Sequence, residues 1–108
     1  MSRPRKDLDK ELVELLAKYN IPKSHLYFQP KSNIYLKYPC IIYNIDDRDT
    51  WKANNKKYLL LKRYSITYIT KDPDDQLPDE LLGSFSYCSF DRSYVTENLY
   101  HSIFSLYF

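Results

Sequence analysis

Residues 58–70 read Tyr-Leu-Leu-Leu-Lys-Arg-Tyr-Ser-Ile-Thr-Tyr-Ile-Thr, and this stretch decides the fold. Successive side chains of a β-strand point to opposite faces of a sheet. That alternation places Tyr64, Ile66 and Tyr68 on one face. Many residues of the stretch are β-branched or aromatic, and such residues favour strands. The stretch therefore predicts one long β-strand.

Other segments predict the rest of the sheet. Residues 38–45 place Ile41, Tyr43 and Ile45 on one face, and Pro39 is tolerated near the start of a strand. The remaining expected strands are residues 85–90, residues 99–108 and, as an edge strand, Leu26–Phe28.

Apolar residues near the N-terminus recur at helical spacing and would form one stripe along a helix. The helix would run from about Pro4 to Tyr19, because Asn20 suits a left-handed cap and Pro22 cannot continue a helix. The residues of the stripe are Leu8, Leu12, Leu15, Leu16 and Tyr19.

A second, short helix is expected from Pro78 to Gly83, with early acidic residues at its N-terminus and the glycine at its end. The order of elements is then helix, strands, short helix, strands. It predicts a single α+β domain over residues 1–108. We expect a mostly antiparallel sheet, with the N-terminal helix and the second short helix packed on one face.

Composition excludes several classes of function. The chain has 108 residues, of which 44% are hydrophobic and 28% charged, as in ordinary globular domains. Its single glycine, Gly83, excludes Gly-rich phosphate loops. The 16 basic and 14 acidic residues give a net charge of +2 and form no basic stripe, so charge alone does not indicate a nucleic-acid partner. With no signal peptide and no spanning apolar run, we expect cytoplasmic folding and no membrane partner.

Tyrosine is the unusual component, with 12 residues in the chain. Tyrosine has a large apolar face and a hydroxyl that needs a partner when buried. One interpretation is that it fills strand positions, where its propensity is high. The other is that it supplies subunit interfaces, and the two are compatible.

Residues suited to acid–base catalysis are few. His25 and His101 are the only imidazoles, and neither lies in a recognisable catalytic signature. His101 falls within the last predicted strand and is interpreted as a structural histidine. We therefore expect no catalytic residue, and we expect that the chain is not an enzyme.

Metal sites and disulfides are not indicated either. Cys40 and Cys88 lie far apart without a CxxC pair, so we predict two free thiols that pack as small apolar groups. The acidic clusters at residues 46–49 and 72–75 match no metal-binding loop, and aspartate favours turns. No metal and no cofactor is expected.

A long connection, Asp46–Lys57, is predicted between two strands, about twice the usual hairpin length. It holds the only tryptophan, Trp51, which would anchor a partner or fold back onto its own domain. Its acidic residues would keep the unbound loop soluble or line a channel. The expected partner-interface residues are Asp46, Asp47, Arg48, Asp49, Trp51, Asn54, Asn55, Asp91, Arg92 and Tyr94.

Five motifs along the chain carry a resemblance. They are Tyr38-Pro-Cys-Ile-Ile-Tyr43, Lys62-Arg-Tyr-Ser-Ile-Thr-Tyr-Ile69, Asp72-Pro-Asp-Asp-Gln-Leu-Pro78, Phe90-Asp-Arg-Ser-Tyr94 and Glu97-Asn-Leu-Tyr-His-Ser-Ile-Phe-Ser-Leu-Tyr-Phe108. Over about residues 26–108, the chain resembles the small tail-completion or tail-terminator (head–tail joining) proteins of long-tailed bacteriophages.

The resemblance implies a structural virion protein, an α+β subunit that forms a ring, usually of six copies, at the head-proximal end of the tail tube. Such a ring ends tube growth. One of its faces would meet the tail tube protein and the other a head-completion protein of the neck. Genomic DNA would pass through the central channel without specific binding. No residue of the family does chemistry, so none is carried over as catalytic.

Two other functions stay open. Head-closure proteins, which form another neck layer, have similar size and composition. A sheet-based module for single-stranded nucleic acid would use Tyr43, Tyr64 and Tyr68 as a stacking platform, with Lys62 and Arg63 on the phosphates. The interleaved acidic residues count against this last alternative.

Overall fold

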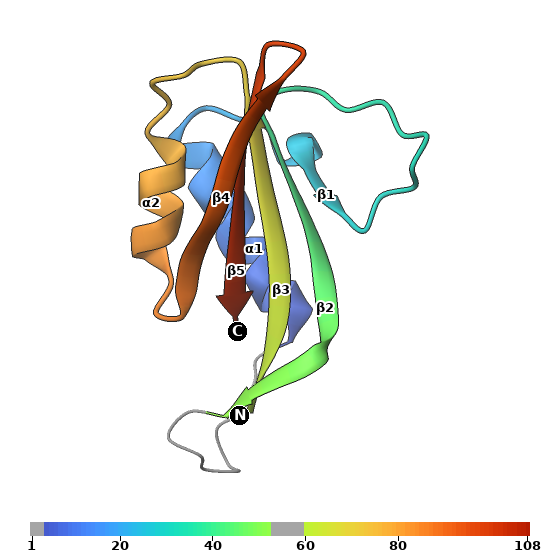
Figure 1. The fold of residues 1–108 in the computed structure, drawn as a ribbon, viewed down its shortest axis with the longest axis vertical. Helices are drawn as coiled ribbons and strands as arrows, with labels where there is room; N and C mark the ends of the chain where they lie inside the picture. Colours follow the sequence, from blue (N-terminus) through green and yellow to red (C-terminus); the bar gives the residue numbers. More distant parts are fainter. Residues whose placement is uncertain (1–3, 53–59) are drawn as a thin grey trace.

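The computed structural model describes the backbone of residues 4–52 and 60–108 and the side chains of residues 4–46 and 61–108. One sheet has the strand order β1-β2-β3-β5-β4, and each neighbouring pair is antiparallel except β1 with β2 (Figure 1). The predicted α+β class is therefore confirmed. The elements are α1 (Arg5–Lys18), the 3-10 helix η1 (Lys23–His25), β1 (Leu26–Phe28), β2 (Cys40–Lys52), β3 (Leu60–Thr70), α2 (Leu77–Ser84), β4 (Cys88–Thr96) and β5 (Leu99–Tyr107).

One face of the sheet packs against both helices and forms the core. Every leucine of the predicted α1 stripe is buried, and Leu77 and Leu81 of α2 join the same apolar cluster. The alternation predicted for β2 and β3 is confirmed, because the side chains expected on one face are the ones in the core. The strand residues of the core are Ile41, Tyr43, Tyr64, Ile66, Tyr68, Phe104 and Leu106.

Helix α1 ends where the sequence predicts. Asn20 has φ 60°, the left-handed cap conformation. Its amide donates to Ala17 O at 3.1 Å, and the amide of Ile21 donates to Leu16 O at 3.0 Å. These two bonds close the last turn of the helix, and burial of Ile21 holds the chain against the core.

Asp75 attaches the start of α2 to the sheet. Its carboxylate accepts hydrogen bonds from Tyr68 Oη at 2.6 Å, from Thr70 Oγ1 at 2.9 Å and from the backbone amide of Leu77 at 3.0 Å. The helix runs on to Ser84, so the prediction that Gly83 ends it is wrong by one residue. The Ser84 hydroxyl donates to Glu80 O at 2.6 Å within this last turn.

The β2–β3 hairpin is longer than predicted. Residues 46–52, expected in a loop, belong to β2, and pairing resumes at Thr50 with Lys62 after an irregularity that follows Ile45. Pairing then continues to Lys52 and Leu60. Strand pairing is made by backbone groups and tolerates polar side chains, and a bulge absorbs the extra residues. The rest of the expected loop, residues 53–57, lies outside the described residues.

The fourth strand also differs from the prediction. It spans Cys88–Thr96 and not residues 85–90, so Phe85 belongs to the connection after α2. Asp91 and Arg92 lie inside this strand, with a register shift between Phe90 and Arg92. Polar residues are compatible with β4 because the strand lies at the edge of the sheet and its side chains face solvent.

Candidate protein–protein interface

Strand β4 forms an exposed edge that carries apolar side chains. It pairs with β5 on one side, and no other strand of the described residues pairs with its outer side (Figure 1). Phe90, Tyr94 and Val95 are 50%, 42% and 57% exposed. An edge strand presents unpaired backbone donors and acceptors, and exposed aromatic residues are enriched in protein interfaces. This edge is therefore a surface suited to a protein partner.

Three of the predicted interface residues lie together on this edge. The Tyr94 ring stacks on His101, with centroids 4.5 Å apart and planes at 11°. The Arg92 guanidinium lies 5.8 Å from the Tyr94 ring centroid. Asp91 accepts a hydrogen bond from Ser105 Oγ at 2.6 Å. The pairing of Asp91 is therefore intramolecular, whereas Arg92 and Tyr94 remain presented to solvent.

The other predicted interface residues fall between positions 46 and 55 of the chain. Asp46 lies on β2, half-buried, with its Oδ2 atom 3.6 Å from Nε of Arg63 on β3. β3 and β5 separate β2 from β4 in the sheet, so Asp46 and the three β4 residues lie on two separate surfaces. Asp47, Arg48, Asp49 and Trp51 lie on β2 with side chains outside the described set, and Asn54 and Asn55 lie outside the described residues altogether.

A third surface was missed by sequence reasoning. Residues 29–39 join β1 to β2 and extend away from the sheet beyond β1 (Figure 1). On this connection Tyr35 is 93% exposed and Ile34 is 44% exposed. Both belong to a segment without strand or helix periodicity, so the spacing of apolar residues did not predict this surface. An apolar pair in a non-repetitive segment between two prolines was the available clue.

The base of this connection is held by specific hydrogen bonds. The Gln29 side chain accepts from the Ile45 amide at 3.1 Å, and the Lys37 amide donates to Tyr27 Oη at 3.1 Å. His25 Nδ1 lies 2.8 Å from Pro39 O. The connection is thus anchored at both ends, and Ile34 and Tyr35 lie between the anchors.

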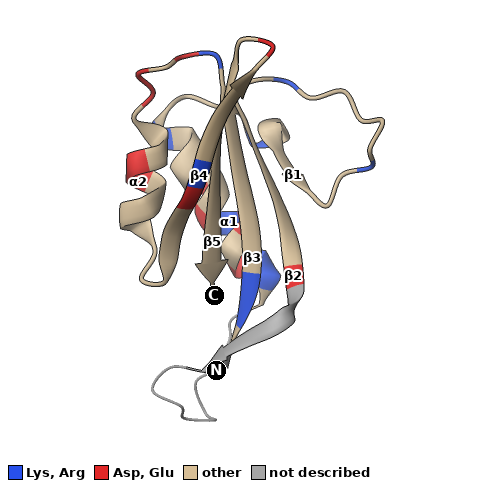
Figure 2. Ribbon diagram, in the orientation of Figure 1, with Lys and Arg blue, Asp and Glu red and all other residues tan. Residues whose placement is uncertain are grey.

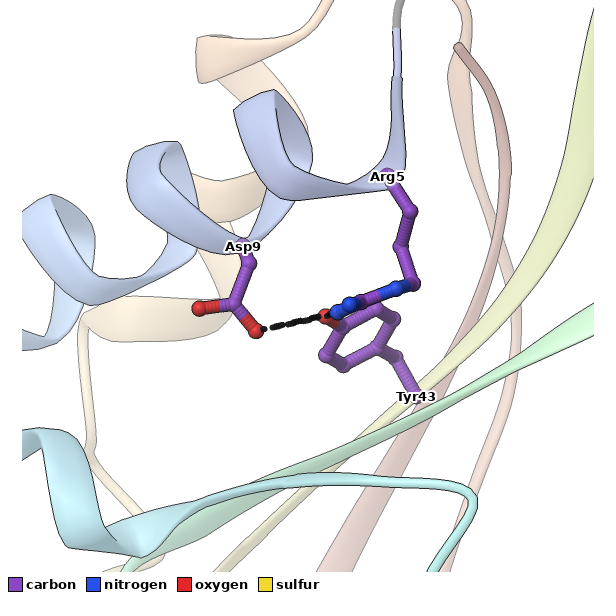
Figure 3. Close-up of polar contacts among 3 residues, drawn as sticks. All are labelled: Arg5, Asp9 and Tyr43. Atoms are coloured by element: carbon purple, nitrogen blue, oxygen red, sulfur yellow. Dashed lines mark hydrogen bonds and ion pairs between the residues drawn. The ribbon is translucent and has the colours of Figure 1, made fainter.

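The polar cluster in Figure 3 fixes α1 on the sheet. Tyr43 Oη donates to Asp9 Oδ2 at 2.6 Å and accepts from Arg5 Nη1 at 3.0 Å. The Arg5 guanidinium also lies 4.4 Å from the Phe28 ring centroid. Burial, followed by the bond to Asp9, raises the pKa of Tyr43 to about 12. Tyr43 therefore stays neutral at ordinary pH. It bridges β2 to Asp9 and Arg5 of α1, which is a structural role.

The thiols have little reactivity in this environment. Cys40 is buried and Cys88 half-buried, and both are free. Burial raises the pKa of Cys40 to about 12, and burial with the Asp91 carboxylate raises that of Cys88 to about 11. The thiolate is the reactive form of cysteine, and it is scarce at neutral pH for both. Their packing agrees with the prediction of small apolar groups.

His101 and the charged side chains can be placed among residues 4–46 and 61–108. His101 Nδ1 lies 3.1 Å from Leu99 O in addition to its stack on Tyr94, as expected of a structural histidine. Within the same residues, no three His, Cys, Asp or Glu side chains group to hold a metal ion. Lys and Arg are distributed over helices, loops and strands with acidic residues among them (Figure 2). No helix in the described part of the chain is long and apolar enough to cross a membrane.

The alternative in which three tyrosines form a stacking surface for nucleic-acid bases is wrong about those residues. Tyr43, Tyr64 and Tyr68 are fully buried under the helices, so a base cannot reach their rings. Arg63 lies on the opposite face of β3 from them, as strand alternation requires. These side chains form core and not a binding surface.

Comparison with known proteins gives no assignment. No protein-family model matches the chain, and no curated protein matches it.

Proposed function

We propose that this chain is a structural subunit that assembles with copies of itself into a ring, of six copies, at the head-proximal end of a bacteriophage tail tube. There the ring ends tube growth and joins the tail to the head. The tail tube protein and a head-completion protein are its other partners.

The observation that carries the proposal is the distribution of exposed apolar side chains. Phe90, Tyr94 and Val95 lie on the β4 edge, and Ile34 and Tyr35 lie beyond β1 at the other edge of the sheet. A subunit of a closed ring needs two different self-associating flanks, because each copy contacts one neighbour with each flank. Exposed aromatic residues on both flanks meet this requirement.

Two further observations support it. The fold is α+β with a mostly antiparallel sheet, the class that the resemblance to tail-terminator proteins implies. Buried polar groups form bridges between elements, as between Tyr68 and Asp75, which suits a structural subunit.

Electron microscopy tests the proposal. The purified chain, alone and mixed with tail tubes, is imaged by negative stain, and its mass is measured by sedimentation. We expect annular particles, and we expect the chain at one end of each tube. Copies scattered along the tube, or a single copy at the neck, would contradict a terminating ring. If the chain were found only on heads that lack tails, it would belong to the head-closure layer instead.

A further inference from the structure

A pocket lies beside the segment that joins α2 to β4, and no residue of the exposed connection lines it. It measures about 250 Å³ and lies where the end of α2, the end of β5 and the side of α1 meet. Phe85 and Phe108 form its aromatic wall, with ring centroids 6.2 Å apart at 77°. Leu61 and Tyr87 complete the apolar lining, and Glu11 of α1 adds a carboxylate.

The pocket has room for an aromatic side chain. A protein cavity of about 150 Å³ already binds benzene, so one of about 250 Å³ accepts a phenol ring. Its walls combine aromatic rings, which favour edge-to-face contacts, with polar groups at the mouth. Ser84 and Ser86 at the end of α2 supply those polar groups, which suit a tyrosine hydroxyl.

The exposed connection offers a matching side chain. Residues 30–38 read Pro-Lys-Ser-Asn-Ile-Tyr-Leu-Lys-Tyr, with exposed lysines at both ends and no acidic residue. Tyr35, 93% exposed, lies between Lys31 and Lys37. The segment is therefore a basic loop with an apolar centre.

The surroundings of the pocket are acidic on the α1 side. Glu11 lines the pocket, and Glu14 lines the adjoining hollow together with Lys18. Lys18 is already paired with Glu80, with Nζ 3.1 Å from Oε2. Another hollow along α1 is lined by Asp7 and Lys10 together with Glu11 and Glu14. Among the residues that line these hollows, Asp7, Glu11 and Glu14 outnumber Lys10 and Lys18, and this acidic excess complements the two loop lysines.

We infer that Tyr35 of one copy inserts into this pocket of the next copy, with Lys31 and Lys37 facing the acidic side of α1. The inference rests on the proposed self-assembling subunit and names its contact. The connection extends beyond β1 (Figure 1), whereas the pocket is lined from the ends of α2 and β5, across β3 from β1. Tyr35 is 93% exposed and so does not fill the pocket of its own copy. Such a head-to-tail contact repeats from copy to copy and closes into a ring when the rotation permits.

Two variants of the full chain test the contact. Tyr35→Ser removes the inserted ring and keeps the pocket, whereas Ser86→Lys fills the pocket with a like charge and keeps the loop. Each variant alone should lose association by about tenfold or more in dissociation constant, as for an interface hot spot. Mixed in equal amounts, they should form dimers and nothing larger, because one intact loop then meets one intact pocket. Analytical ultracentrifugation measures all three samples.

Matched controls separate this contact from general damage. Tyr35→Phe keeps the ring and should assemble like the wild type. Leu82→Ala removes another exposed apolar side chain, and Gln76→Lys adds the same charge at the opposite end of α2. Both should leave association unchanged, and circular dichroism should show every variant folded.

A charge exchange gives a second measurement. Glu11→Lys with Glu14→Lys should weaken association by about tenfold, and adding Lys31→Glu with Lys37→Glu to the same chain should restore it in part.

The outcomes distinguish the contact from the proposed function. If the wild type forms rings and both Tyr35→Ser and Ser86→Lys still form them, the contact is overturned and the ring stands. If Tyr35→Ser forms rings but no longer binds tail tubes, the loop binds another protein and the contact is again overturned. If the wild type does not associate with itself even on a tube end, the proposed ring is overturned and the contact with it.

Discussion

Strands β3 and β4 are both rich in aromatic residues, yet they use them in opposite ways. In β3, Tyr64 and Tyr68 are fully buried between the sheet and the helices. In β4, Phe90 and Tyr94 are about half exposed. β3 is the central strand of five and β4 is an edge. The position of a strand in the sheet, and not its composition, therefore decides whether an aromatic residue stabilises the core or is available to a partner.

The largest expected effect is on the β3 side of this comparison. Tyr68→Ala should lower the free energy of unfolding by about 3–5 kcal/mol, because it leaves a cavity under the helices. It also removes the phenol that donates to Asp75. Urea denaturation followed by circular dichroism measures the change. A loss below about 1 kcal/mol would mean that β3 is no more central to stability than β4.

The second-largest expected effect is a loss of stability at alkaline pH, where the buried tyrosines ionise. Burial raises the pKa of Tyr43 to about 12, above its ordinary value of 10.0, and raises those of Tyr64 and Tyr68 as well. A folded-state pKa above the unfolded value means that stability is complete below pH 10.0 and falls as pH rises toward about 12. Cys40, raised from 9.0 to about 12 by burial, adds to the loss from lower pH.

Absorbance of the phenolate against pH measures this effect, with denaturation curves at each pH. The three buried tyrosines should ionise in a late phase that accompanies unfolding, because burial raises their pKa values. Tyr43→Phe should reduce the late phase by one residue. A single phase for every tyrosine in the folded protein would contradict the burial of Tyr43, Tyr64 and Tyr68.

Within β3, removing the hydroxyl of Tyr68 or of Tyr64 should change the free energy of unfolding by smaller amounts, and the two variants can be compared directly. Tyr68→Phe should lower the free energy of unfolding by about 1–2 kcal/mol, because Asp75 loses a hydrogen-bond donor. Tyr64 Oη is buried and has no hydrogen-bond partner among the described residues. Tyr64→Phe should therefore be neutral or slightly stabilising. Equal losses from the two variants, measured by urea denaturation, would show that the Tyr64 hydroxyl does have a partner.

The smallest effect on stability is expected on the β4 side. Phe90→Ser with Tyr94→Ser should change the free energy of unfolding by about 1 kcal/mol or less, because these side chains already contact solvent. Self-association measured by sedimentation should nevertheless weaken. The comparison of the two strands fails if this double variant unfolds as readily as Tyr68→Ala. Unchanged association would place the β4 edge outside the ring contact.

Much of the fold was predictable because local patterns carry it. The leucine spacing of α1 and the alternation of Ile41, Tyr43, Ile66 and Tyr68 each report a buried face directly. The left-handed cap at Asn20 was predictable for the same reason, since it depends on neighbours in the chain. The ends of β2 and β4 were not, because pairing with another strand decides how far a polar segment stays extended.

The candidate interface was predictable only in part. Asp91, Arg92 and Tyr94 were predicted as interface residues from the sequence, but Ser105, which donates a hydrogen bond to Asp91, is distant in the chain. Tyr35 was not predicted as an interface residue, because an exposed side chain in a non-repetitive segment leaves no periodic pattern in the sequence. The pocket around Phe85 and Phe108 joins three elements and cannot be seen in any one segment.

The sequence by itself determined which apolar side chains share one face of a helix or strand, since side chains at helical or alternating spacing can leave water together. It also determined the α+β order of elements. Only the tertiary structure decided the strand order, and with it that β4 lies at an edge where Phe90 and Tyr94 are exposed. The reason is that burial depends on what packs against a residue from elsewhere in the chain, and local spacing does not contain that information.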